Sequence, residues 1–208
     1  VIADGLDIFQ DVLAYVVLLI ALLLFHAAFT YSLFLKFIGG LNPLTFYRKM
    51  KDVALFAFST SSSAATIPVT LRTVNQDLGV NQNVASFVVP VGASINMDGT
   101  AIMQGLATVF IAQMSGIDLT LFQYIQVVLL AVATSIGTAA VPSAGTITLI
   151  IILQQFNLPL EAIGIILAVD RVLDMIRTSV NVTGDAAIAC IVAKTENQLD
   201  ENIFNSKA

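Results

Sequence analysis

A stripe of polar and charged residues interrupts an otherwise apolar stretch near the end of the chain, "DRVLDMIRTSVNVTGD" (170–185). At about 100° per residue, a helix would carry five of these side chains within a stripe roughly 80° wide, with Thr178 at its edge. The five residues are Asp170, Asp174, Arg177, Asn181 and Asp185. Charged residues in an apolar helix face a bundle interior or a cavity, so this face is a candidate binding site.

The residue types in the stripe suit a ligand that carries both charges. Arg177 offers a planar fork that matches a carboxylate, and Asp174, one turn earlier, can accept from an ammonium group. Asn181 or Thr178 can bridge the remaining polar atoms. We therefore expect an amino acid with an acidic side chain as the ligand. The alternative is an internal ion pair between Asp174 and Arg177 that only orients helices.

A second acidic position lies in "SINMDGTAIMQG" (94–105), where Asp98 precedes Gly99. Asp98 and Asp185 each lie beside a glycine and near an asparagine, with no basic neighbour in sequence, and an uncompensated buried carboxylate costs several kcal/mol. Backbone carbonyls loosened around the glycines would complete an oxygen cage for a hard cation such as sodium. The alternative is a protonated aspartate, which would correspond to proton coupling.

The composition places these sites in a membrane. The chain has 208 residues, of which 57% are hydrophobic and 11% charged, and its mean hydropathy is +0.90. No Asp, Glu, Lys or Arg occurs between Asp11 and Lys36, and the segment 12–35 exceeds the roughly 20 residues that cross a bilayer. It is too long for a secretory signal and lacks a basic leader. We expect an all-α, multi-pass membrane protein that binds no nucleic acid.

Basic residues indicate the sidedness. They follow the first span and the last one, namely Lys36, Arg48, Lys49, Lys51 and Lys194. Positive loops face the cytoplasm, so the polar tail 195–208 is expected to be cytoplasmic and to fray. The chain opens with Val, so we expect the sequence to begin within a longer protein. His26 is expected to make a polar contact inside the bundle rather than relay protons.

Two segments have the features of re-entrant hairpins. From Leu119 to Leu160 there is no charge, but "TSIGTAAVPSAGT" (134–146) breaks the stretch into arms at 119–133 and 147–156, each shorter than a bilayer is thick. Such irregular backbone survives at membrane depth only inside protein or beside water. Earlier, Asn42 and Pro43 predict a helix start, and the helix runs to Phe58 before "STSSSAATIPVT" (59–70) interrupts it.

The two breaks are related in sequence. "TSSSAATIP" (60–68) superimposes on "TSIGTAAVP" (134–142) with matching Thr, Ser, Ala and Pro. Each hairpin is followed by a helix with buried acids and an asparagine near glycine. If the intervening broken helix crosses once, the hairpins enter from opposite sides and meet near the midplane, which is the inverted-repeat plan of secondary transporters.

Four ordered motifs, "SSSAATIPVT", "NMDGT", "SIGTAAVPSAG" and the 170–185 stretch, closely resemble the dicarboxylate/amino acid:cation symporters, which include excitatory amino acid transporters and archaeal aspartate transporters. The resemblance runs from about residue 7 to 196. It implies an elevator-type transport domain in six segments: the sixth membrane helix (1–40), a first hairpin (41–80), a broken helix with NMDGT (81–117), a second hairpin that gates the extracellular side (118–157), a substrate-binding last helix (158–194) and the tail (195–208).

The resemblance also implies residue roles. Substrate-contacting positions are Ser62, Ser63, Thr100, Val141, Gly145, Asp174, Arg177, Thr178 and Asn181. Three sodium sites are implied. The first would use Gly92, Asn96, Asn181 and Asp185, and the second the carbonyls of Ser94, Ser135, Ile136 and Thr138. The third would use Asn96 and Asp98 together with residues of a helix absent here. Ser61 and Met175 stand where archaeal and excitatory members, respectively, carry an arginine.

The resemblance implies sodium-coupled symport of L-aspartate or L-glutamate, with co-transported sodium ions, in a homotrimer of the cell membrane assembled through scaffold helices. It implies no enzymatic activity. Proton-coupled C4-dicarboxylate or glutamate symport is the alternative, and Asp174 and Asp185 argue against it because such carriers tend to have neither acid. A distant alternative is an intramembrane aspartyl protease, since Gly184 and Asp185 fit part of a GxGD pattern, but Val182 occupies the first glycine position.

Overall fold

The computed structural model describes residues 2–206, with side chains from Ile8 onward. Regular structure in this range is helical apart from one isolated bridge between Val80 and Leu199, so the all-α prediction is confirmed. The helices are α1 (Ile2–Phe25), the π-helix η1 (His26–Tyr31), α2 (Ser32–Phe37), α3 (Pro43–Thr60), α4 (Ser63–Gln76), α5 (Gln82–Ile95), α6 (Asp98–Met114), α7 (Leu121–Ile136), α8 (Ala144–Gln155), the 3-10 helix η2 (Leu160–Ala162), α9 (Ile163–Thr195) and α10 (Glu201–Asn205).

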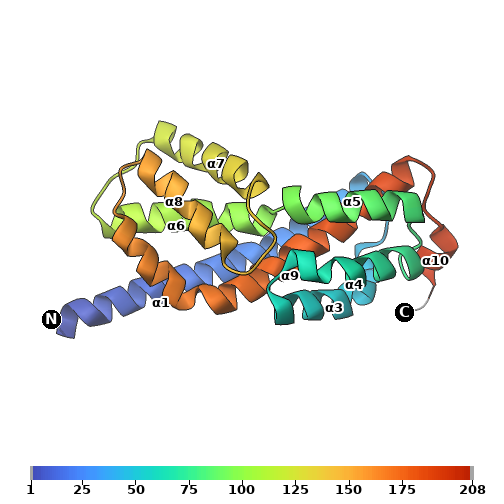
Figure 1. The fold of residues 1–208 in the computed structure, drawn as a ribbon, viewed down its shortest axis with the longest axis horizontal. Coiled ribbons are helices and arrows are strands. Elements are labelled where there is room, and N and C mark those ends of the chain that lie inside the picture. Colours follow the sequence, from blue (N-terminus) through green and yellow to red (C-terminus); the bar gives the residue numbers. More distant parts are fainter. Residues whose placement is uncertain (1, 207–208) are drawn as a thin grey trace.

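The long helix α9 is the centre of the molecule (Figure 1). It contacts α1, α3, α4, α5, α6 and α8. Helices α6, α7 and α8 lie together on one side of α9, in the half of the molecule nearer the chain's N-terminus, whereas α3, α4, α5 and α10 gather at the opposite end (Figure 1). Because α9 is in contact with both groups, its middle lies where the two groups meet.

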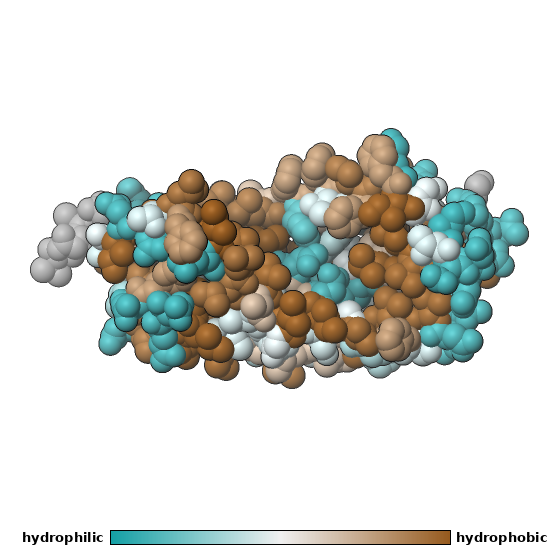
Figure 2. Space-filling model, turned by 90° about the horizontal axis from the view of Figure 1, so that it is seen from above, coloured by the Kyte–Doolittle hydropathy of each residue, from teal (hydrophilic) through white to brown (hydrophobic). Residues whose placement is uncertain are grey.

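One helical stretch in the described residues, Ile8–Phe37, is long and apolar enough to cross a membrane. Large apolar side chains such as Phe9 and Phe37 are exposed on it. Figure 2 shows hydrophilic residues at both ends of the molecule and a broad apolar band between them, with a hydrophilic group near the middle of that face. This pattern is typical of a protein whose middle contacts lipid.

The break between α3 and α4 is narrower than the sequence predicted. Asn42 caps α3 as expected, accepting from Leu44 N at 2.9 Å. The helix then continues to Thr60, and only Ser61 and Ser62 interrupt it, so the predicted interruption over 59–70 is wrong. Threonines after the break are accommodated in the helix, where their hydroxyls bond to carbonyls one turn earlier, as Thr66 does to Ser62 O at 2.8 Å.

The break between α7 and α8 is also shorter than predicted. Helix α7 runs to Ile136 and α8 begins at Ala144, which leaves residues 137–143 as the connection. The start of α7 has the capping box of Thr120 and Gln123. Ser143 lies in the left-handed region with φ +60°, as does Ser61 with φ +51°, so a serine turns the chain sharply at each break.

The prediction that the tail frays is wrong for the residues up to Ser206. Phe204 in α10 is fully buried, and Asp200 caps this helix by accepting from Asn202 N at 2.9 Å. Lys49 of α3 donates to Ile203 O at 2.7 Å and to Ser206 Oγ at 3.2 Å. One apolar anchor and a cap therefore order a segment that its polar composition marked as loose. Lys207 and Ala208 lie outside the described residues, as does Val1.

Candidate functional site

The two hairpin tips contact each other. Ser62 Oγ, at the start of α4, donates to Ala140 O at 2.8 Å, and Ala64 N donates to the same carbonyl at 3.2 Å. Ala140 belongs to the connection between α7 and α8, 78 residues away in sequence from Ser62. The contact between the serine-rich tip and the proline–glycine tip that the sequence predicted is therefore confirmed.

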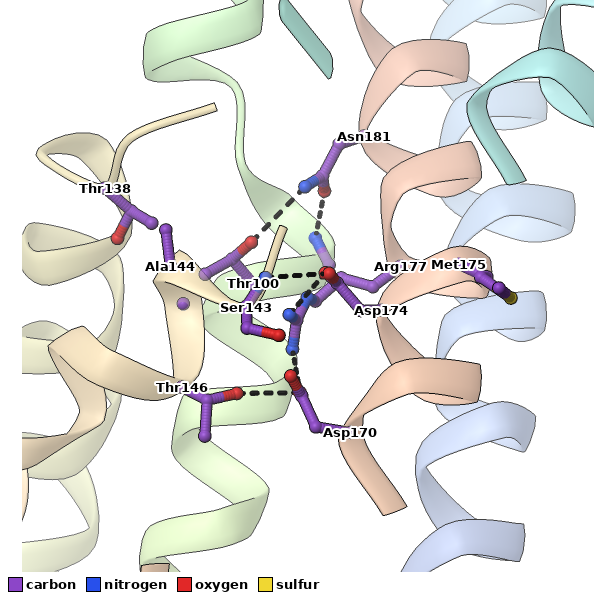
Figure 3. Close-up of polar contacts among 12 residues, drawn as sticks. Thr100, Thr138, Ser143, Ala144, Thr146, Asp170, Asp174, Met175, Arg177 and Asn181 are labelled. Atoms are coloured by element: carbon purple, nitrogen blue, oxygen red, sulfur yellow. Dashed lines mark hydrogen bonds and ion pairs between the residues drawn. The ribbon is translucent and has the colours of Figure 1, made fainter. Parts of the chain in front are cut away.

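The charged stripe of α9 faces the second tip, where Ser143 and Ala144 lie (Figure 3). Arg177 Nη2 lies 2.5 Å from Asp174 Oδ1, and Arg177 Nη1 lies 3.5 Å from Asp170 Oδ1. Thr146 of α8 donates to the same Asp170 oxygen at 2.7 Å. The side chains of Arg177, Asp170 and Asp174 are each 6% exposed or less. The prediction that the stripe faces the interior is confirmed, and the guanidinium bridges two acids of its own helix.

Asp174 also holds the second tip. Ser143 N donates to Asp174 Oδ2 at 2.9 Å, so both oxygens of this carboxylate are engaged (Figure 3). The internal ion pair that the sequence left as an alternative is thus present. It does not exclude a binding site, because a ligand carboxylate can compete for the guanidinium and a ligand ammonium can compete for Asp174.

A small cavity of about 20 Å³ lies at the meeting point of the tips and α9. Eight of the nine predicted substrate residues line it: Ser63, Thr100, Val141, Gly145, Asp174, Arg177, Thr178 and Asn181. This volume holds about one water molecule, so the cavity as it stands is too small for an amino acid.

The ninth residue, Ser62, has a different place. Its Oγ accepts from Ala65 N at 3.2 Å as the cap of α4 and donates to the other tip. Ser61 lines the cavity instead, and its buried Oγ has no hydrogen-bond partner in the described residues. Met175 projects away from the charged group in Figure 3. The family resemblance marked Ser61 as the arginine position of archaeal members but assigned the substrate contacts to Ser62 and Ser63.

Two further residues shape the site. A Cβ on Gly145 would lie 2.8 Å from Thr100 Cγ2, so glycine lets α8 approach α6 closely. Gln104 is fully buried and donates to Gly145 O at 3.0 Å and to Thr148 Oγ1 at 2.8 Å. It also accepts from Thr134 Oγ1 at 2.8 Å. Gln104 was not predicted from the sequence, although a glutamine in the middle of the apolar α6 was a usable signal.

The first set of predicted cation residues is brought together at the α5–α6 break. Asn96 Nδ2 donates to Asp185 Oδ1 at 3.0 Å, and a Cβ on Gly92 would lie 2.7 Å from the same oxygen. Asn181 lies one turn earlier on α9, where its Oδ1 accepts from Gly99 N at 2.8 Å. Its Nδ2 donates to Thr100 Oγ1 at 3.3 Å. Asn181 thus fastens the start of α6 to α9, next to Asn96 and Asp185.

Asp98 has two partners on the first helix. His26 Nε2 lies 3.1 Å from Asp98 Oδ2, and Tyr31 Oη donates to the same oxygen at 3.2 Å. The predicted polar contact of His26 inside the bundle is confirmed. Tyr31 was missed, because in a regular helix it would not share a face with His26.

The second set of predicted cation residues is less closely gathered. Ser94 and Ile136 are exposed, Ser135 Oγ donates to Val132 O at 2.9 Å, and Thr138 Oγ1 donates to Thr134 O at 2.8 Å. Within residues 2–206 no hydrogen bond joins Ser94 to the α7 end. No group of three or more His, Cys, Asp or Glu side chains forms in the described residues. The acids therefore do not gather into one cluster, and each would offer oxygen ligands to a cation separately.

Comparisons of the sequence with known proteins show what the chain is similar to. The profile of the Sodium:dicarboxylate symporter family matches residues 1–195. The chain is 41% identical over 191 residues to an excitatory amino acid transporter of Caenorhabditis elegans, covering 92% of the chain and 38% of that relative. It is 43% identical over 178 residues to excitatory amino acid transporter 2 of Homo sapiens, covering 86% of the chain and 31% of that relative. For excitatory amino acid transporter 3 of Mus musculus the identity is 42% over 202 residues, with coverage of 97% and 39%. The chain therefore spans only 31% to 39% of the length of these relatives.

Proposed function

The chain belongs to the sodium:dicarboxylate symporter family, and we propose that it forms the ligand-binding part of a sodium-coupled symporter for L-aspartate or L-glutamate. The similar relatives are named excitatory amino acid transporters, and transporters of this family are membrane proteins, not enzymes. The sequence resemblance from four motifs is confirmed by the family match. The substrate of the whole protein is our proposal, because this chain is shorter than its relatives.

The pairing of Arg177 with Asp174 carries the proposal. A buried guanidinium 2.5 Å from a carboxylate, at the contact of two hairpin tips, presents both charges that an acidic amino acid needs. The ligand's side-chain carboxylate would take the fork of Arg177, and its ammonium would take Asp174. Thr178 and Asn181 would bind the remaining polar atoms, and the first tip would supply Ser63 and backbone donors. Ser62 would hold the tip in place.

Sodium ions are the co-transported cargo. Asp185 with Gly92, Asn96 and Asn181 would form one site, since all of these offer oxygen ligands to a hard cation. Asp98 with Asn96 would contribute to another. A further site would use the carbonyls of Ser94, Ser135, Ile136 and Thr138, and these groups would come together when the second tip changes position.

The proposed architecture has two opposed re-entrant hairpins, α3–α4 and α7–α8, related as inverted repeats. The six segments of the sequence analysis, from 1–40 to 195–208, would then form an elevator-type transport domain. It would work in a homotrimer of the cell membrane that is assembled through other parts of the protein. The contact of Lys49 with α10 supports a common side for the first basic cluster and the tail, and we assign that side to the cytoplasm.

The alternatives fit the geometry less well. A C4-dicarboxylate could take the fork of Arg177 but has no ammonium group for Asp174, so proton-coupled dicarboxylate transport leaves Asp174 without a ligand role. An aspartyl protease requires two acids that share one catalytic site. Asp98 instead bonds to His26 and Tyr31, while Asp185 bonds to Asn96.

Uptake by the full-length protein in liposomes tests the proposal. We expect accumulation of radiolabelled L-aspartate when external sodium exceeds internal sodium, and none when choline replaces sodium. A pH gradient alone should drive no accumulation. Equal uptake in choline, or uptake driven by the pH gradient alone, would reject sodium coupling.

A further inference from the structure

The first membrane helix contains a π-helical turn where it contacts Asp98, one of the proposed sodium ligands. Residues His26–Tyr31 form a π-helix between α1 and α2. Residues five apart in an α-helix point about 140° away from each other, but His26 and Tyr31 both reach Asp98 Oδ2. The π turn therefore places two hydrogen-bonding side chains on one carboxylate oxygen. Such turns occur frequently at functional sites.

Tyr31 also lies against the neighbouring cation residues. Its side chain is buried, with 2% exposure. A Cβ on Gly184 would lie 2.5 Å from Tyr31 Oη and 2.6 Å from Asn96 Nδ2. Since Asn96 donates to Asp185, the tyrosine hydroxyl stands between Asp98 and the Asn96–Asp185 pair, and glycine at 184 makes room for it.

The hydrogen bonds leave one oxygen of Asp98 for another partner. Both described hydrogen bonds to this side chain end on Oδ2, and the side chain is 38% exposed, in contrast to the buried Asp170 and Asp174. A carboxylate fastened through one oxygen keeps a fixed orientation and offers the other to a cation.

We propose that Tyr31, aided by His26, is a positioning residue that orients the Asp98 carboxylate for sodium and links this site to the Asp185 site. The inference rests on the proposed sodium coupling and deepens it. Within the described side chains no hydrogen bond joins Tyr31 to a predicted substrate residue; it acts through Asp98 and through its packing against Gly184 beside Asn96. Its loss should therefore weaken sodium binding and reduce the steepness with which sodium promotes aspartate binding.

The test is the sodium dependence of L-aspartate binding to full-length Tyr31→Phe. Because a hydrogen bond to a charged group is removed, we expect the half-saturating sodium concentration to rise about tenfold. Aspartate affinity at saturating sodium should stay unchanged. Tyr47→Phe is the matched control, because the Tyr47 hydroxyl donates to Ala27 O in the same π segment and does not touch Asp98. It should leave the sodium dependence unchanged.

Asp98→Asn separates the inference from the function on which it rests. If Asp98→Asn does not alter the sodium dependence, the proposed role of Asp98 fails. If Asp98→Asn shifts it but Tyr31→Phe does not, only the role of Tyr31 fails. Equal shifts in Tyr31→Phe and Tyr47→Phe would reduce Tyr31 to a packing residue. In the double variant, Tyr31→Phe should add no further shift to Asp98→Asn, whereas an additive shift would overturn the link.

Discussion

Ser143 donates its backbone N–H to Asp174 Oδ2 at 2.9 Å, and this bond fastens the second hairpin tip to the helix that carries the charges. The other oxygen of Asp174 pairs with Arg177. A ligand ammonium that takes Asp174 must therefore displace the tip, the guanidinium or both. Under the proposed function, the ligand ammonium, the α7–α8 tip and the guanidinium would compete for this one carboxylate.

Arg177→Cys should change the ligand preference of the site. Without the fork, the side-chain carboxylate of aspartate loses its partner, whereas the ammonium site at Asp174 remains. We expect acidic amino acids to lose at least tenfold in affinity and neutral amino acids such as serine to compete better, measured by displacement of labelled substrate. Arg171→Cys is the control, because Arg171 is exposed on the same helix. Unchanged affinity for aspartate in Arg177→Cys would remove the arginine from the site.

Asp185→Asn should weaken sodium binding. The variant keeps an oxygen that Asn96 can reach but removes the charge that attracts the cation. The expected rise in half-saturating sodium is at least tenfold, about 1.4 kcal/mol, measured by aspartate binding at increasing sodium. Asp118→Asn, at an exposed position, should leave the curve unchanged. Identical curves for wild type and Asp185→Asn would show that this acid holds no sodium.

Gly145→Ala should impair ligand binding without changing sodium dependence. The added methyl would lie 2.8 Å from Thr100 Cγ2 and 3.3 Å from Met103 Cε, and overpacking of this kind costs about 1–3 kcal/mol. Gly105→Ala on α6 meets nothing within 4 Å, so it should be neutral or slightly stabilising. Calorimetric aspartate affinity at saturating sodium distinguishes the two. An unaffected Gly145→Ala would mean that α8 can move away without loss.

Lys49→Met should release the C-terminal helix. Lys49 is 9% exposed and donates to Asp77 O, Ile203 O and Ser206 Oγ. Ile203 O keeps Ser206 N and Ser206 Oγ as donors, but the variant loses the bonds that join α3 to α10, and a hydrogen bond from a charged donor contributes about 1.5–3 kcal/mol. Amide hydrogen exchange in α10 should accelerate at least tenfold, whereas Lys51→Met, at an exposed position, should not affect it. Unchanged exchange in Lys49→Met would mean that Phe204 alone anchors the helix.

Local sequence rules predicted the helices and the contact between the two hairpin tips. They did not predict the residues at which α3 and α7 end and α4 and α8 begin. The cap at Asn42 and the apolar length of 12–35 follow from chemistry within a few residues. The interruption at 59–70 was predicted too wide because serine and threonine are compatible with a helix when their hydroxyls bond to preceding carbonyls, as those of Thr66 and Thr70 do.

The part of the candidate site that lies on a regular α-helix could be predicted from the sequence. The stripe on α9 followed from the helical repeat alone, and family resemblance added the tip residues. The contact of Tyr31 with Asp98 could not be predicted, since it depends on a π turn that shifts the face of the helix. The order of the tail depends on Phe204 entering a core built by distant helices, and local composition does not encode that.

The central claim is that buried acids and Arg177 bind an acidic amino acid together with sodium. Calorimetric titration of L-aspartate into the full-length protein at several sodium concentrations tests it most directly. The account predicts affinity that rises steeply with sodium and binding that disappears when choline replaces sodium. Aspartate affinity that is the same in sodium and in choline would contradict it.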